Sequence, residues 1–294
     1  MFYMNIKNKL FSLGLFSILG MVSLLFTTSH FTKTGEQLHE ATLITKDLEV
    51  RLLNLRRNEK DFLLRSDIKY LDKFENNYRQ FQDLESELAG VLEDLSLANT
   101  AQLRQDISDY HKSFTVLVGA YQVLGLSDDE GLLGQFHKDL AVNFERASDE
   151  EKLALYQFNE LVEQGNLDLS LLSNAQANFL SSAQKVVDQK AKIGLKHNQG
   201  LLGEARSASH KVETQFKEFS SLLKDTTAEQ LERLNLINNV LSGALLVIIV
   251  VLSWVIVRSI VGRIESLLSV IRRIVDSNDV SIRSELKGHD ELGS

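Results

Sequence analysis

Residues 236–257 read LINNVLSGALLVIIVVLSWVIV, and this stretch decides the fold. It contains no charged residue, and it is close to the roughly 20 residues that an α-helix needs to cross the hydrocarbon core of a bilayer. A second uncharged stretch, LFSLGLFSILGMVSLLFTT, occupies residues 10–28. Two such segments near opposite ends of a chain predict two transmembrane helices that enclose a large polar region.

Charged residues beside the two segments predict their orientation. Lys7 and Lys9 precede the first segment, and Arg258 and Arg263 follow the second. Because basic residues are retained on the cytoplasmic side, both termini are expected in the cytoplasm and the polar region in the periplasm. The first segment has no small-x-small cleavage site after it, so an uncleaved membrane anchor is favoured over a signal peptide.

The composition excludes several classes of protein and favours long helices. The chain has 294 residues, a formal net charge of -8, no cysteine and no proline. Without cysteine there is no disulfide or thiolate metal site, and without a basic stripe no nucleic-acid partner is expected. Proline interrupts helices and is common in turns between strands, so its absence predicts an all-α protein.

The polar region has the periodicity of amphipathic helices, with apolar residues mostly three, four or seven positions apart. One aromatic series, interpreted as a packed core rather than a binding cage, comprises Tyr70, Phe74, Tyr78 and Phe81. Glycine, asparagine and N-cap residues divide the pattern into six predicted helices, the last of which continues into the second apolar segment. Their expected ranges are 32–94, 99–124, 129–146, 149–163, 167–196 and from about 201 onward. Short turns between such helices predict an antiparallel bundle.

The sequence contains no catalytic motif of the nucleotide-binding, zinc-protease or serine-hydrolase type. Its seven histidines are scattered, and no two of them have the i, i+4 spacing of helical metal ligands. The sequence therefore predicts no enzymatic activity, no metal site and no cofactor.

A basic cluster on the first long helix is the candidate binding site. Arg56 and Lys60 are four positions apart and Arg57 and Lys60 three, so these cations share part of a helix face, with Arg51 preceding them. Arginine binds carboxylates through paired hydrogen bonds, so a pocket lined by this cluster would suit a small organic acid. The alternative is a solvated face with pairs within the helix, such as Arg57–Asp61, and the residues alone leave both interpretations open.

The run LRRNEKDFLLR at residues 55–65 resembles the first-helix signature of the helical bimodular (HBM) sensor domain of bacterial chemoreceptors and some sensor kinases. This resemblance implies two long and four short helices that form two stacked four-helix bundles. It also implies a carboxylate ligand contacted by first-helix arginines, which makes Arg56 and Arg57 the leading candidates, followed by Arg51 and Lys60. Thr214 of the last helix is a candidate to face them.

Residues 258–294 resemble the start of a HAMP linker. The apolar spacing from Ile264 to Val275 predicts a short amphipathic helix with a coiled-coil seam, and Asp290-Glu291-Leu292-Gly293 resembles the motif that opens the second HAMP helix. Family members usually carry a proline just after the membrane span, whereas Gly262-Arg263 occupies that stretch here. A HAMP linker implies a homodimer and an output domain after it, because a single pair of HAMP helices cannot bury its seams.

These observations predict the following parts: cytoplasmic N-terminus 1–9, transmembrane helix 10–29, periplasmic HBM sensor domain 30–235, transmembrane helix 236–257 and partial HAMP linker 258–294. The predicted function is that of a methyl-accepting chemotaxis protein in the bacterial inner membrane. It would sense a small organic acid and pass a helix shift through the bilayer to HAMP. Downstream signalling proteins are expected as partners only where an output domain follows. The alternatives are the sensor region of a histidine kinase or cyclase, and a membrane-anchored helical scaffold that binds a protein.

Overall fold

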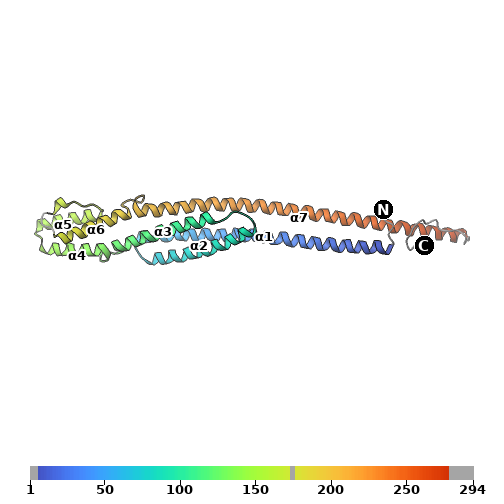
Figure 1. Ribbon diagram of the computed structural model, residues 1–294, viewed down its shortest axis with the longest axis horizontal. Helices are drawn as coiled ribbons and strands as arrows, with labels where there is room; N and C mark the ends of the chain where they lie inside the picture. The colour runs from blue at the N-terminus through green and yellow to red at the C-terminus, as the bar shows by residue number, and fades with distance from the viewer. Residues whose placement is uncertain (1–5, 173–175, 278–294) are drawn as a thin grey trace. The chain divides into compact units, whose positions relative to one another are not determined.

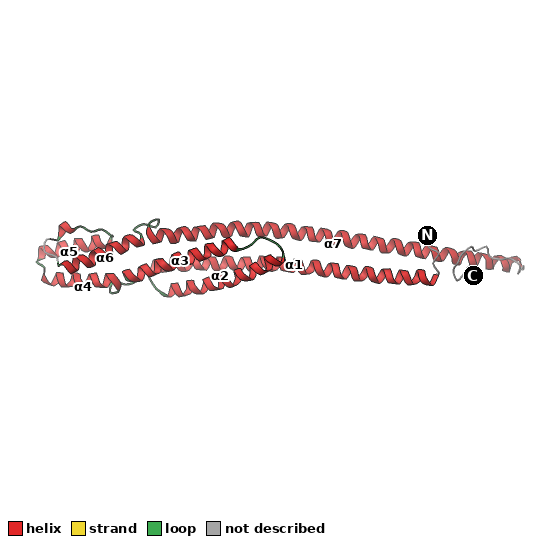
Figure 2. Ribbon diagram, viewed as in Figure 1, coloured by secondary structure: helices red, strands yellow, loops and turns green. Residues whose placement is uncertain are grey.

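The computed structural model describes residues 6–172 and 176–277, and every regular element among them is a helix (Figure 2). In chain order these are α1 (Ile6–Arg65), α2 (Lys69–Asp94), α3 (Ala101–Leu124), α4 (Gly131–Arg146), α5 (Asp149–Glu163), the 3-10 turn η1 (Leu169–Leu171), α6 (Ala177–Ile193) and α7 (Gly200–Ser277). No strand occurs in the part of the chain that the structure describes. The prediction of an all-α protein is confirmed.

The chain divides into two compact units, and both α1 and α7 contribute residues to each. The apolar unit consists of Met1–Leu38 and Thr227–Ser294, and the bundle unit is His39–Thr226. Because α7 is one helix from Gly200 to Ser277, the predicted continuity of the last helix into the second apolar segment is also confirmed.

In the apolar unit, α1 and α7 are each long and apolar enough to cross a membrane. Their apolar side chains are exposed, as Phe26 and Trp254 illustrate. The two helices approach closely at Gly20, where an added Cβ would lie 2.9 Å from Cδ1 of Ile249. Small residues allow such close packing between membrane helices. These features indicate that the protein is associated with a membrane.

A break at residues 66–68 separates α1 from α2, so the predicted single helix over 32–94 is wrong. Ser66 has a φ of 47°, in the left-handed region, and Oδ1 of Asp67 accepts a hydrogen bond of 2.9 Å from the backbone N–H of Lys69. Short polar side chains compete with helical hydrogen bonds in this way. The break reverses the chain, so that α2 returns alongside α1 (Figure 1).

The remaining helices lie close to their predicted ranges, with one further exception. Helix α5 begins and ends as predicted, and at its start Ser148 and Glu151 form a reciprocal capping box that satisfies free backbone groups. Helices α3 and α4 each begin two residues later than predicted. The prediction of one helix over 167–196 is wrong in its first part, where η1 precedes α6.

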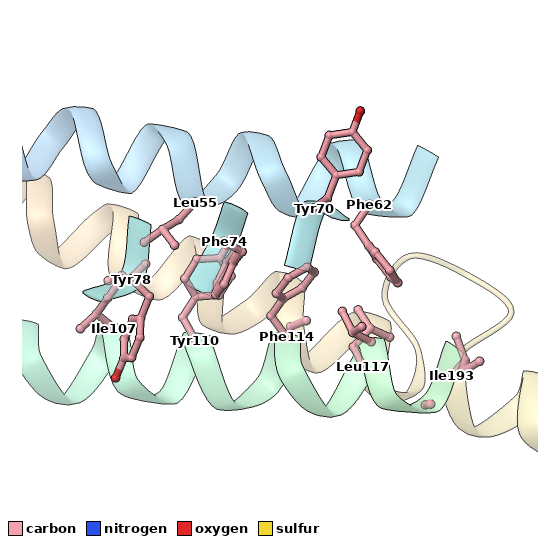
Figure 3. Close-up of a cluster of buried hydrophobic side chains, with 14 of the residues drawn as sticks. Leu55, Phe62, Tyr70, Phe74, Tyr78, Ile107, Tyr110, Phe114, Leu117 and Ile193 are labelled. Atoms are coloured by element: carbon pink, nitrogen blue, oxygen red, sulfur yellow. The ribbon is translucent and has the colours of Figure 1, made fainter. Parts of the chain in front are cut away.

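Aromatic side chains from α1, α2 and α3 form the first core of the bundle unit (Figure 3). The ring centroids of Phe74 and Phe114 are 4.3 Å apart, and Phe62 meets Phe114 edge-on at 5.8 Å. Tyr110 contacts Phe74 edge-on at 5.4 Å. All four residues of the predicted aromatic series are buried, which confirms their interpretation as core.

A second aromatic core lies among α4, α5 and α6, which Figure 1 shows gathered together. The ring of Phe179 on α6 stacks on Phe136 of α4 at 5.6 Å and contacts Phe158 of α5 at 5.4 Å. All three rings are fully buried. Each of these helices therefore contributes a large aromatic side chain to a shared core.

The connections α3–α4 and α6–α7 have the same sequence pattern and the same backbone conformation. Residues 125–134 read GLSDDEGLLG and residues 194–203 read GLKHNQGLLG. The first glycines have φ of 116° and 113°, and the second glycines 56° and 53°. Each residue of the first segment lies 69 positions before its counterpart in the second. The same offset separates Ala120 from Gln189, whose side-chain amide donates a hydrogen bond of 2.7 Å to the backbone carbonyl of Ala120. We term these segments the repeated loops.

Replacement of Gly194 by alanine is expected to lower the free energy of unfolding by about 1–3 kcal/mol, because an L-residue is strained at this φ. The new Cβ would also overlap the backbone carbonyl of Gln199. Hydrogen exchange of the α6 amides measures this loss. Gly90→Ala is the matched control: it lies within α2 with no heavy atom near its added Cβ, so it should stabilise by about 0.5–1 kcal/mol. Equal effects of the two substitutions would contradict the strain argument.

Candidate functional site

Arg56 lies on the face of α1 that contacts α7. Its Nη1 donates a hydrogen bond to Oε2 of Glu213, and only 19% of its side chain is exposed. Glu213 also accepts a hydrogen bond of 2.8 Å from Lys217. That hydrogen bond, together with the charge of Arg56, holds the pKa of Glu213 below its ordinary value. Arg56 is thus paired, and its pair joins α1 to α7.

Glu59, one turn after Arg56, joins three helices inside the bundle. Its Oε2 accepts a hydrogen bond from the hydroxyl of Tyr110 on α3, and the buried hydroxyl of Ser209 on α7 lies beside both groups. Burial raises the pKa of Glu59 above its ordinary value, while the hydrogen bonds from Tyr110 and Ser209 oppose this shift. Burial also raises the pKa of Tyr110, so this hydroxyl keeps its proton and remains a donor.

A polar pocket of about 210 Å³ lies between α1 and α2, and we term it the α1–α2 pocket. Its lining residues are Asn54, Arg57, Asn58, Asp61, Lys73, Asn76 and Asn77. Asn58 is only 6% exposed, and its Nδ2 has no hydrogen-bond partner. A buried donor without a partner costs free energy, so an acceptor atom of a ligand would stabilise this site.

The charges of the α1–α2 pocket favour an anion. Two cations, Arg57 and Lys73, face one carboxylate, Asp61. The Nε of Arg57 lies 3.8 Å from Oδ2 of Asp61, and 77% of the Arg57 side chain is exposed. This long contact leaves the guanidinium donors available for a bidentate carboxylate, and the asparagine amides add further donors.

The predicted cluster of four cations is not brought together at one place. Arg57 lines the α1–α2 pocket, whereas Arg56 faces Glu213. Lys60 is exposed and belongs neither to the α1–α2 pocket nor to the pair of Arg56 with Glu213. Arg51 is half-buried, and its Nε has no hydrogen-bond partner. Thr214, the candidate on the last helix, is exposed, and its neighbour Glu213 makes the contact to Arg56.

Sequence reasoning missed the second wall of the pocket, which α2 supplies. A signal for it exists in Asn76-Asn77, an adjacent pair of short amides in the middle of an amphipathic helix. These residues face α1 only because the chain reverses at residues 66–68, so the signal is readable only once that break is known.

No family model, curated protein or solved structure matches the chain. Its described residues form a helical bundle unit with a polar pocket, joined to two helices of membrane-spanning length.

Proposed function

We propose that the protein is the sensing part of a transmembrane receptor, in which a ligand binds the bundle unit and α7 passes the signal across the membrane. The observation that carries this proposal is the continuity of α7. This helix contains Glu213, which pairs with Arg56, and also the apolar segment 236–257 and the basic Arg258. A displacement of α7 in the bundle unit would therefore be passed directly to the opposite end of the helix.

The proposed ligand is a small organic acid bound in the α1–α2 pocket. Its carboxylate would accept hydrogen bonds from Arg57 and from the free amide of Asn58, with Lys73 on the opposite wall. The likeness of residues 55–65 to the HBM signature, whose members include receptors for carboxylic acids, supports the same ligand class. Arg56, Lys60 and Arg51 remain candidates through that resemblance.

The proposed coupling runs through adjacent residues of α1. Arg57 and Asn58 face the pocket, whereas Arg56 and Glu59 contact α7 and α3. Suppose that α1 and α7 can take two positions relative to each other within the bundle unit, which we call two registers. A ligand that binds better to one register shifts the population toward that register. The size of the shift is limited by the difference between its affinities for the two registers.

The proposed location is the bacterial inner membrane, with the bundle unit in the periplasm and both termini in the cytoplasm. The support is the charge pattern: Lys7 and Lys9 precede the first apolar segment, and Arg258 follows the second. Signalling of the chemotaxis type is the leading proposal, and the sensor region of a kinase or cyclase is an alternative. We propose no catalytic role for the chain.

A homodimer is proposed from exposed apolar residues on α1 and α7. Leu43, Val50, Leu53 and Leu64 lie on the face of α1 opposite its buried stripe, and each is about half or more exposed. Exposed apolar stripes of this kind mark interaction surfaces. Near the end of α7, Ile264, Leu268, Ile271 and Val275 are also exposed, as expected of a HAMP helix described without its partner. The predicted HAMP connector and second helix lie outside the described residues.

A membrane-anchored scaffold is the second candidate function. The same stripe on α1 favours it, because a protein partner could cover these residues in place of a second copy of the chain. In that case the α1–α2 pocket would bind no small molecule, and the cations that line it would be ordinary surface residues.

Arg57→Ala is expected to weaken binding of the ligand by about tenfold or more, since it removes the bidentate donor. The measurement is titration calorimetry of the full chain in lipid nanodiscs against succinate, acetate and benzoate. Arg79→Ala is the matched control, because Arg79 is an exposed cation of α2 that lines no pocket described above. Failure of all three acids to bind, or equal effects of the two substitutions, would contradict the carboxylate site.

Movement of α7 is tested separately from binding. The chain has no cysteine, so Thr115→Cys on α3 and Ser221→Cys on α7 can carry a single pair of spin labels at exposed positions. If the protein is a receptor, the distance between the labels should change when an acid that binds to the chain is added. Binding with an unchanged distance would rule out the proposed coupling and favour the scaffold.

A further inference from the structure

A second pocket, of about 530 Å³, lies between the two repeated loops, and we term it the repeat pocket. Its apolar lining comes in pairs that the 69-residue offset relates: Leu124 with Ile193, and Leu126 with Leu195. Leu133 completes the apolar part. None of these residues lines the α1–α2 pocket, so the two pockets are separate sites.

The repeat is broken at the charged positions of this pocket. Lys190 stands where the first copy has Tyr121, and Asp128 stands where the second copy has His197. Both Lys190 and Asp128 line the pocket, whereas His197 does not. The apolar positions thus match between the copies, and the charges of opposite sign are unique to one copy each.

A third charged residue, Glu163, also lines the pocket, and its Oε1 accepts a hydrogen bond of 3.1 Å from Asn159. Lys190 and Asp128 have fewer partners within the protein. Lys190 donates one hydrogen bond, of 2.6 Å, to the backbone carbonyl of Glu163, which leaves two ammonium hydrogens free. The carboxylate of Asp128 makes no hydrogen bond or ion pair with the described residues, and only its backbone carbonyl is engaged, by His137. Burial lowers the pKa of Lys190, opposed by the charges of Glu163 and Asp128, so this ammonium is partly desolvated and would gain from an anionic partner.

We propose that the repeat pocket binds an α-amino acid with an apolar side chain. Its carboxylate would bind Lys190, its ammonium would bind Asp128, and its side chain would pack on Leu126, Leu133 and Leu195. A plain acid would leave Asp128 facing another negative charge, and a plain amine would leave Lys190 facing another positive charge. A zwitterion satisfies both groups at once, and the paired leucines supply a surface for the apolar side chain.

The proposal goes beyond the carboxylate site and does not depend on it. The probe is L-leucine, titrated into the full chain in nanodiscs, with 4-methylpentanoate and isoamylamine as analogues that each lack one charged group. Lys190→Gln and Asp128→Asn should each weaken leucine binding by about tenfold, which corresponds to about 1.4 kcal/mol. Both analogues should bind at least about tenfold more weakly than leucine.

Lys185→Gln is the matched control, because Lys185 is an exposed cation on the same helix. It should leave leucine binding unchanged, and so should Arg57→Ala, which removes a residue of the other pocket. Asp128→Asn alters an exposed side chain without structural contacts, so its loss of binding cannot be attributed to misfolding. The proposal is overturned if leucine, valine, methionine and phenylalanine all fail to bind at about 1 mM. It is equally overturned if Lys190→Gln and Asp128→Asn behave like Lys185→Gln.

Discussion

Phe114→Ala is expected to lower the free energy of unfolding of the bundle unit by about 3–5 kcal/mol, the range for truncation of a buried aromatic residue. Phe114 is fully buried and contacts Phe62 of α1 and Phe74 of α2. Its loss would leave a cavity where α1, α2 and α3 meet. Hydrogen exchange of buried amides on all three helices, in the full chain in nanodiscs, measures the change.

The control is Val116→Ala, a truncation on the same helix at a side chain that is 47% exposed. It should change the free energy of unfolding by no more than about 0.5 kcal/mol. If Phe114→Ala weakens protection on α3 alone and leaves α1 and α2 unchanged, the three helices do not share one core as described.

Glu59→Ala is expected to cost about 3 kcal/mol, because it leaves the buried hydroxyl of Tyr110 without its acceptor and opens a small cavity. Glu59→Gln should cost far less, since the amide oxygen can still accept the hydrogen bond from Tyr110. Hydrogen exchange of the α3 amides compares the two variants with the unsubstituted protein. A loss as large for glutamine as for alanine would show that the charge of Glu59, and not its role as acceptor, stabilises the network.

Glu59 should make the stability of the protein depend on pH, and Glu59→Gln, which cannot titrate, is the reference. The sign of this pH dependence follows from the pKa of Glu59. Burial raises this pKa above the ordinary value of 4.5, so the folded protein binds the proton more tightly than the unfolded chain. The stability contributed by Glu59 is therefore complete below pH 4.5 and is lost as pH rises through the raised pKa. The unsubstituted protein should lose stability relative to Glu59→Gln as pH rises from 4.5. A relative gain over that interval would contradict the burial argument.

The sequence supports prediction of the helical fold because its signals are local. The absence of proline, the aromatic spacing from Tyr70 to Phe81 and the glycines at 125 and 194 each act within a few residues of themselves. The break at residues 66–68 escapes such reasoning, because serine and aspartate also occur inside helices. The left-handed φ of Ser66 and the hydrogen bond from Lys69 to Asp67 distinguish this position, and neither can be read from the sequence.

The candidate site was predictable only in part, because its contacts join residues far apart in the chain. A basic run on one helix predicts cations, but it does not say which of them a partner neutralises. Arg56 and Arg57 are neighbours in sequence, yet Glu213, 157 positions away, pairs with the first while the second lines a pocket. That difference arises from the rotation of about 100° between successive helical residues and from the position of α7.

The loop that precedes α7 has a consequence for how far a movement can spread. A hinge needs residues that can change φ and ψ without steric conflict. In the loop 194–200 both end glycines have positive φ, and the backbone N–H groups of Gly194 and Gln199 donate hydrogen bonds of 2.9 Å. The bond at Gly194 closes the last turn of α6 and the bond at Gln199 lies within the loop, so neither ties α6 to α7. Glycine changes φ and ψ more freely than any other residue, so Gly194 and Gly200 make this loop a hinge at which α7 can move while α6, and the second aromatic core packed on it, stays in place.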